Sequence, residues 1–230
     1  MPEAVVMAAG LGTRLRPLTE RWAKPVLPVD GEPVLVLLLR ELAAAGCTDV
    51  TVVVGHLGGQ VRRLCGDGSD VGLRLRYAVQ ARPDGSAGAV AVAAAEPPYL
   101  VVGADTVFTP GDVAAFAAAW SAAGAGGALA LRPLEDGASR RNGVRAAGVV
   151  VERLRSPEPT HVGAPLWAVG PELASRVADL RGEPPYELAA AFQGAIDAGT
   201  RIAGIEIGPT RDLTTPADLL LENFPYLRDL

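Results

Sequence analysis

Two glycines and two basic side chains near the start of the chain have the types and spacing of a phosphate-binding loop. Gly10 and Gly12 come shortly after an apolar run, residues 4–7, that predicts a buried strand. Glycine lacks a Cβ, so its backbone can approach a ligand closely, and successive amides in such a turn form a concave anion site. Arg14 and Lys24 add positive charge just downstream. The loop is therefore predicted to bind phosphate groups.

Two familiar phosphate-binding motifs do not fit this loop. A Walker A loop requires Gly-Lys followed by Ser or Thr, and none stands at that spacing. The dinucleotide-binding fingerprint G-x-G-x-x-G would place a third glycine at the position of Leu15. Pro17 also leads us to expect no helix before that residue. A bare G-x-G pair would equally fit a tight connection between a strand and a helix.

Residues 10–28 as a whole resemble the signature of the sugar-phosphate nucleotidylyltransferases, G-x-G-x-R-x-x-P-x-T followed by K-P-x-x-P. The matching residues are Gly10, Gly12, Arg14, Pro17, Thr19, Lys24, Pro25 and Pro28. The resemblance implies a glycosyltransferase-A-like α/β fold: a Rossmann-like, mostly parallel sheet flanked by helices, with a small inserted α+β part that faces the substrate.

The same resemblance implies roles for individual residues. Arg14 would neutralise the departing pyrophosphate, and Lys24 would steer the acceptor phosphate and stabilise the α-phosphate. The backbone amides that would cradle the triphosphate are those of Ala9, Gly10, Leu11, Gly12 and Thr13.

Two aspartates stand where α/β proteins hold ligands. Asp105 follows a predicted parallel strand, residues 99–102, and ligands of open α/β sheets bind at the carboxyl ends of strands. Asp212 precedes the predicted last helix. Each alone would also fit a turn or capping residue. The resemblance implies that the pair holds Mg²⁺, a cation that suits two carboxylates and takes its other ligands from water and phosphate.

A third segment, residues 77–87, resembles the branch of the family that transfers thymidylyl and uridylyl groups. In that branch a strand ends with Gln and Pro-x-Gly follows, as Gln80, Pro83 and Gly85 do here. A Gln amide offers both a donor and an acceptor to a pyrimidine, and a glycine backbone can approach the base. Read locally, Gln80 is a polar strand end. The resemblance implies dTTP or UTP, with GTP as the alternative because guanylyltransferases share this layout.

The resemblance is weakest where family members hold the sugar phosphate. They commonly carry Glu-Lys-Pro after a hairpin, whereas this chain has Arg-Leu-Arg-Ser-Pro at 153–157. The family's Asn-x-Gly segment is present only as His-Val-Gly-Ala at 161–164. Arg155 would either supply the missing positive charge or be a solvated surface residue. We therefore assign no sugar-contacting residue in this region.

Apolar periodicity and turn residues predict strands that alternate with helices. The predicted strands cover residues 4–7, 49–55, 73–79, 99–102, 128–131, 164–169 and 201–207, with a hairpin over 143–155. The predicted helices cover residues 34–45, 59–64, 86–96, 110–123, 171–180, 187–198 and a last one from 216. Thr109 and Thr215, each before a proline, are predicted N-caps. The chain ends soon afterwards, and we expect none of the C-terminal domains of larger relatives.

The composition predicts one α/β domain. The 230 residues are 49% apolar and carry a net charge of −5 at pH 7, which fits a single globular domain with a sizeable core. We predict a nucleotide-binding core over residues 1–132 and 200–230 and a substrate-facing part over residues 133–199. Cys47 and Cys65 stand in no disulfide or zinc pattern, which predicts free thiols.

Charge and hydropathy argue against several classes of protein. Acidic and basic residues are interspersed, which speaks against a nucleic-acid-binding surface. No apolar run is long enough to span a bilayer, and the N-terminus lacks a secretory signal pattern. We expect a cytoplasmic monomer or small homo-oligomer whose partners are small molecules.

These features together predict nucleotidyl transfer, in which a sugar 1-phosphate attacks a nucleoside triphosphate and expels pyrophosphate. Two alternatives stay open. A cytidylyltransferase for an alcohol phosphate such as phosphocholine would need aromatic or acidic groups around the cation, and Trp22 and Trp167 leave this open without favouring it. A non-catalytic nucleotide-binding regulatory module would account for the missing Glu-Lys pair, but Lys24, Asp105 and Asp212 weigh against it.

Overall fold

The computed structural model describes residues 3–134, 142–179, 183–224 and 226–227. Residues 135–141, within the predicted substrate-facing part, lie outside the described residues, as does the end of the helix predicted at 171–180. None of the helices in the described part has the length and apolar character needed to span a bilayer. Cys47 and Cys65 are free thiols, as predicted, and burial raises the pKa of Cys65 to about 11.

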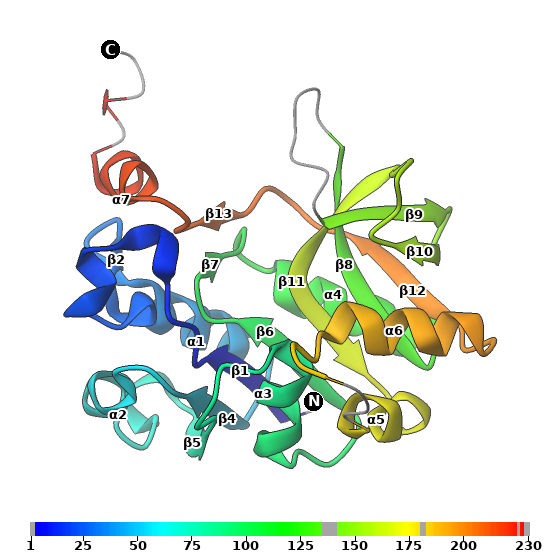
Figure 1. Cartoon of the computed structure of the whole chain (residues 1–230), viewed down its shortest axis with the longest axis horizontal. Coiled ribbons are helices and arrows are strands. Elements are labelled where there is room, and N and C mark those ends of the chain that lie inside the picture. Colours follow the sequence, from blue (N-terminus) through cyan, green and yellow to red (C-terminus); the bar gives the residue numbers. More distant parts are fainter. Residues whose placement is uncertain (1–2, 135–141, 180–182, 225, 228–230) are drawn as a thin grey trace.

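Within the described residues, nine strands form one sheet in the order β5-β4-β1-β6-β11-β8-β12-β10-β9 (Figure 1). Their bounds are β1 Glu3–Ala8, β4 Asp49–Val54, β5 Arg74–Val79, β6 Tyr99–Gly103, β8 Gly127–Pro133, β9 Gly143–Ala147, β10 Val150–Leu154, β11 His161–Val169 and β12 Ile202–Glu206. Strands β5, β4, β1 and β6 are parallel, and β8 is parallel to β12. Strand β11 runs antiparallel to both β6 and β8. The α/β fold is confirmed, and the sheet is mixed because β11 separates its two parallel groups.

Helices cover both faces of this sheet. Their bounds are α1 Val34–Ala44, α2 Gly58–Cys65, α3 Ser86–Ala93, α4 Asp112–Ala123, α5 Pro171–Ala178, α6 Leu188–Asp197 and α7 Pro216–Asn223. One apolar core packs α1, α2 and α4 against the sheet, and a second packs α3, α5 and α6 against its other face. Alternate residues of β1 divide between the two cores, since Val6 belongs to the first and Val5 to the second. A strand buried on both faces reads as the continuous apolar run that the sequence shows.

Two short antiparallel ladders lie outside the main sheet. Strand β2 (Pro28–Val29) pairs with β3 (Glu32–Pro33), just before α1. Strand β7 (Thr106–Val107) pairs with β13 (Arg211–Asp212), so that the segment before the last helix returns to the end of β6 (Figure 1). The second ladder joins two parts of the chain that are about a hundred residues apart, and it determines where Asp212 lies.

Two local predictions about helix starts are wrong. A short 3-10 helix, Thr13–Leu15, begins before Pro17, because a single 3-10 turn needs no donor from the proline. Helix α4 is capped by Gly111 at φ 89° and not by Thr109, whose hydroxyl donates instead to the carbonyl of Pro209 at 2.9 Å. The tertiary hydrogen bond displaces the local cap.

The predicted cap of α7 is confirmed. Thr215 is the N-cap residue, and its side chain and that of Asp218 form a reciprocal capping box. The carboxylate of Asp218 accepts hydrogen bonds from the backbone N–H groups of both Thr214 and Thr215. The box fixes the start of α7 at Pro216, three residues after the fully buried Leu213.

Thr215→Ala is expected to lower the local stability of α7 by about 1 kcal/mol, because the side-chain acceptor for the Asp218 N–H is lost. Amide hydrogen exchange across residues 216–223 measures this change. Thr214→Ala is the matched control, since Thr214 engages Asp218 through its backbone only. Equal exchange rates in the two variants would contradict the assignment.

Candidate active site

The glycine loop is held in a folded conformation by its own side chains. Gly12 has φ 62°, a left-handed conformation that favours glycine, and a Cβ placed there would lie 2.8 Å from Thr19 Cγ2. The Thr19 hydroxyl donates to the Gly12 carbonyl at 2.9 Å. Lys24 also packs against this point, since its own Cβ would lie 3.4 Å from a Cβ placed on Gly12. Gly12, in the first part of the 10–28 signature, therefore lies against Thr19 and Lys24 in its later part.

Side chains from helix α2 and from the turn that precedes it hold residues 19–23 of the loop in place. Gln60 on α2 donates to the carbonyl of Arg21 at 2.7 Å and accepts from the N–H of Ala23 at 2.8 Å. His56 Nε2 lies 2.8 Å from the Thr19 carbonyl oxygen. Sequence reasoning missed both residues, because a polar side chain in a turn, such as His56, or on a short helix, such as Gln60, gives no signal of such a role.

Lys24 forms an ion pair with Asp105, the carboxylate that follows β6. The Lys24 side chain is 12% exposed and that of Asp105 is 39% exposed, so the ion pair is only partly accessible to solvent. Lys24 is also the only lysine among the 21 lysine and arginine residues of the chain. A lysine is a compact point charge and differs from the planar arginine fork, so one lysine in an arginine-rich chain marks a position with a special requirement. This signal was available in the sequence.

Asp212 lies beside the Lys24–Asp105 pair because of the β7–β13 ladder. Asp212 is directly opposite Thr106, the residue after Asp105, and Thr106 donates its hydroxyl proton to Asp212. The N–H of Leu213 donates to the Asp105 carbonyl at 3.3 Å. Asp212 also faces Arg132 at the end of β8, with 3.7 Å between Oδ2 and Nη1. The structure thus brings both predicted aspartates to one edge of the sheet, each beside a basic side chain.

The carboxylate pair has the donor chemistry that Mg²⁺ prefers. No group of three or more His, Cys, Asp or Glu side chains in the described ranges could hold a metal ion. A magnesium ion that arrives with a nucleotide needs only one or two carboxylates, because phosphate oxygens and waters complete its shell. Asp105 and Asp212, 39% and 34% exposed, fit such a shared site.

Gln80 lies at the carboxyl end of the parallel strands, next to the start of the loop. A Cβ at Gly55 would lie 2.9 Å from the carbonyl oxygen of Ala9 and 3.2 Å from that of Gln80, so the ends of β1, β4 and β5 meet there. The Gln80 amide nitrogen donates to Asp84 Oδ1 at 2.6 Å and to the Gly85 carbonyl at 3.0 Å. A carboxylate and a carbonyl only accept, so both amide protons are used and Oε1 is left as the group open to a ligand.

Gly85 has a structural requirement that the sequence did not reveal. Its φ is 115°, and a Cβ there would lie 2.3 Å from the carbonyl oxygen of Tyr186. The backbones of the two segments are joined, because Tyr186 N donates to Asp84 O at 2.6 Å and Ala87 N donates to Tyr186 O at 2.8 Å. The close approach of another part of the chain therefore accounts for this glycine, independently of any nucleobase.

The remaining predicted residues line the surface of the loop. Ala9 is buried at the end of β1, whereas the loop is exposed at Gly10, Leu11, Thr13 and Arg14. Within the described part of the chain, the Arg14 side chain has no hydrogen-bond or ion-pair partner. An exposed, unengaged guanidinium beside a glycine turn is available to an anion.

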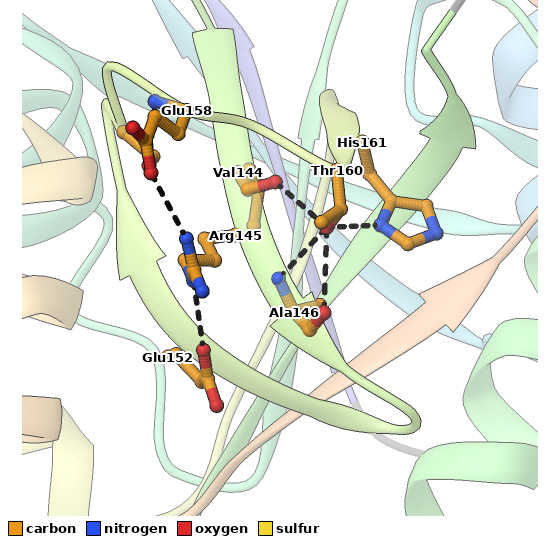
Figure 2. A network of polar contacts seen from close by, with 8 residues as sticks. Val144, Arg145, Ala146, Glu152, Glu158, Thr160 and His161 are labelled. Carbon is orange, nitrogen blue, oxygen red and sulfur yellow. Dashed lines mark hydrogen bonds and ion pairs between the residues drawn. The ribbon is translucent and has the colours of Figure 1, made fainter.

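The hairpin that would carry Glu-Lys-Pro in the family has a different polar network (Figure 2). Arg145 pairs with Glu152 at 3.2 Å and with Glu158 at 3.3 Å, so its charge is engaged within the hairpin. Ser156 is buried and accepts from the N–H of Glu158 at 3.2 Å. Arg155 is exposed and has φ 51°. These contacts stabilise the hairpin without directing a basic group to the aspartates.

A glycine loop after the first strand and a carboxylate pair at the carboxyl edge are features of α/β proteins that bind nucleotides. The model of the nucleotidyl transferase family matches residues 3–154, well over half of the chain. The chain belongs to this family.

Two relatives are similar to part of this chain. It is 48% identical over 91 residues to a glucose-1-phosphate thymidylyltransferase of Streptomyces antibioticus, which covers 40% of this chain and 26% of the relative. It is 39% identical over 136 residues to the CMP-5'-(3-aminopropyl)phosphonate synthase of Streptomyces rubellomurinus, which covers 57% of this chain and 21% of that protein. The aligned part is thus about a quarter or less of these relatives.

A solved structure supports the fold over the whole chain. A UDP-glucose pyrophosphorylase complexed with UDP-glucose superposes with a TM-score of 0.85, covering 100% of both chains at 15% identity. At this identity the likeness concerns the fold alone.

Gly85→Ala is expected to destabilise the protein by roughly 1–3 kcal/mol, because the new Cβ meets the Tyr186 backbone and the φ is unfavourable. Gly10→Ala is the matched variant, since no atom lies within 4 Å of a Cβ there. It should leave the unfolding free energy within about 0.5 kcal/mol while weakening triphosphate binding. Urea unfolding and nucleotide titration separate the two effects, and unchanged stability of Gly85→Ala would refute the packing argument.

Proposed function

We propose that the protein is a Mg²⁺-dependent nucleotidylyltransferase that joins a nucleoside triphosphate to a sugar 1-phosphate. The observation that carries the proposal is the Lys24–Asp105 pair, which lies between the glycine loop and Asp212. Family membership supports the reaction class, and the thymidylyltransferase name of a relative supports the substrate class. Residues 133–199 would then supply the acceptor side.

The proposed reaction needs no nucleophile from the protein. An oxygen of the sugar 1-phosphate attacks the α-phosphorus, a new P–O bond forms, and the bond to the β-phosphate breaks to release pyrophosphate. Positioning and charge stabilisation are sufficient for such a transfer. The amides of residues 9–13 and Arg14 would hold the triphosphate, and Lys24 would align the acceptor with the α-phosphate. Mg²⁺ held by Asp105 and Asp212 would neutralise phosphate charge.

Gln80 supports a preference among nucleobases. Its two amide protons are used within the chain, so Oε1 would accept a hydrogen bond from the base. Thymine and uracil carry a ring N–H on their pairing edge, as guanine does, whereas the donors of cytosine and adenine on that edge are exocyclic amino groups. An acceptor opposite the ring nitrogen would therefore favour dTTP, UTP or GTP, and the resemblance of residues 77–87 to the branch that transfers thymidylyl and uridylyl groups supports dTTP or UTP first and GTP second.

A matrix of nucleoside triphosphates against sugar 1-phosphates, read by pyrophosphate release with and without Mg²⁺, tests the proposal. We expect activity with dTTP or UTP, and a loss of at least about 100-fold in Asp105→Asn and in Asp212→Asn. Asp49→Asn is the matched control, because Asp49 is an exposed carboxylate that pairs with Arg74 at the sheet edge. Near-normal turnover in Asp105→Asn would overturn the metal assignment.

The single lysine gives a direct test of Lys24. Amine-reactive labelling followed by peptide mass mapping can modify only this side chain and the N-terminal amine. Bound triphosphate with Mg²⁺ should slow labelling of Lys24 severalfold, since its ammonium would contact phosphate. Lys24→Arg should keep the charge and lose most of the activity, because the planar fork does not replace a point charge. Labelling that ligand does not change would contradict the role.

A second candidate is a cytidylyltransferase for a phosphonate or alcohol phosphate. The identity to a protein named as a CMP-phosphonate synthase favours it, as does the missing Glu-Lys pair. Aromatic support is limited: Trp167 packs edge-on against Phe192 at 4.7 Å, and Trp22 is 55% exposed. The same matrix, extended with CTP and alcohol phosphates, distinguishes the candidates. No turnover with intact nucleotide binding would indicate a regulatory module.

A further inference from the structure

Arg132 is a basic residue at the carboxyl edge that the proposed reaction does not yet use. It lies near the end of β8, where it is opposite Val162 of β11, and its side chain is 27% exposed. Nη1 donates to the Thr210 hydroxyl at 2.6 Å and lies 3.7 Å from Asp212 Oδ2. Its Nε is buried, and no other buried side-chain polar atom of the described residues lacks a hydrogen-bond partner.

The arginines that hold the fold together use their guanidinium groups differently. Arg74 donates from Nε and Nη2 to both oxygens of Asp49, at 2.8 and 2.6 Å. Arg211 donates to Asp30 at 2.6 Å and to Glu222 at 3.1 Å. Arg132 forms one short hydrogen bond and a long ion pair, so most of its five donors have no acceptor among the residues that the structure describes. An underused guanidinium in a partly buried position suits an anionic ligand.

The position of Arg132 in the sheet indicates which anion it would meet. The glycine loop and Gln80 follow β1 and β5, on one side of β6. Arg132 is on β8, across β11 on the other side, and Val162 of β11, which is opposite Arg132, also pairs with Gly143 of β9. Asp105, which follows β6, and Asp212 lie between the two sides. Arg132 is therefore placed opposite the triphosphate side of the site.

The charged side chains of the site are paired in a way that the binding of a cation would change. Asp105 is paired with Lys24, and Asp212 with Arg132. When both carboxylates take part in holding a divalent cation, these two basic groups lose their counterions and become available to phosphate oxygens. On the β9–β10 hairpin Arg145 is already engaged by two carboxylates, and Ser156 stands in the segment where the family has Lys.

We propose that Arg132 binds the phosphate dianion of the acceptor and so takes over the task of the missing lysine. This inference rests on the proposed function. The ligand class is a phosphate or phosphonate monoester, which the planar guanidinium recognises through two parallel N–H donors. The Thr210 hydroxyl, which accepts from Nη1, holds the guanidinium in place, and Arg132 acts together with Lys24 on the acceptor.

The test measures phosphate binding directly, without turnover. Inorganic phosphate is titrated calorimetrically into the full chain and into Arg132→Gln, Arg132→Lys and Arg155→Gln. We expect the dissociation constant to rise roughly 10- to 100-fold in Arg132→Gln and less in Arg132→Lys, which keeps the charge. Arg155→Gln, on the exposed hairpin, should match the unaltered protein. Thermal melting checks folding, and Thr210→Val, which removes the short hydrogen bond to Arg132, provides a second variant.

Several outcomes would overturn the proposal. Phosphate that binds only in the glycine loop would be lost in Arg14→Gln and kept in Arg132→Gln. Loss in Arg155→Gln alone would assign the acceptor phosphate to the hairpin, and absence of phosphate binding in the unaltered protein would remove the site. If a substrate pair turns over, Arg132→Gln should raise KM for the acceptor while KM for the nucleotide changes by less than roughly threefold. Failure of every substrate pair would reject the proposed function while leaving the phosphate titration interpretable.

Discussion

The ion pair between Lys24 and Asp105 joins the loop after the first strand to the end of the fourth strand along the sheet. Two partly buried charges are stable together but costly apart, since removal of either partner leaves an uncompensated charge in a poorly solvated place. The surrounding contacts fix the backbone segments that carry this ion pair. Gln60 fixes the backbone on both sides of Trp22, and the β7–β13 ladder fixes the segment that follows Asp105. The loop, the second strand–helix unit and the end of the chain are thereby tied to one point.

This arrangement lets one site hold two acidic and two basic groups before any substrate is bound. Without Lys24 and Arg132, the carboxylates of Asp105 and Asp212 would repel each other across the short ladder, and the site would lose the geometry that a metal needs. With them, the groups that would contact phosphate are already present at partial burial. On the proposed function, binding would change which of these groups are paired. A preorganised site of this kind fits chemistry that depends on positioning more than on a nucleophile.

Much of the fold and of the candidate site was predictable, because the sequence signals for them are local. The apolar period gave the strands and helices, and the 10–28 signature, Asp105 and Asp212 gave the candidate site through family resemblance. Features that depend on distant partners were missed: the antiparallel course of β11, the Tyr186 backbone against Gly85, and the bond of Thr109 to Pro209. Each of these is set by a segment far away in the sequence, where one-dimensional patterns carry no information. The lone lysine was visible from composition, but its partner was not.

The segment that would bind the acceptor is the part of the chain that differs most from the family pattern. The β9–β10 hairpin is part of the main sheet, yet Arg145 on it is paired with Glu152 and Glu158, and Ser156 after it is buried. On the proposed function, an acceptor dianion that met only Lys24 and the metal ion would be bound more weakly than one that also met a second side-chain cation. The underused guanidinium of Arg132 stands at the edge where that charge is required. On the proposed function, the presence of Lys24, Asp105 and Asp212 together with a basic side chain at Arg132 is more consistent with a changed acceptor than with a lost activity.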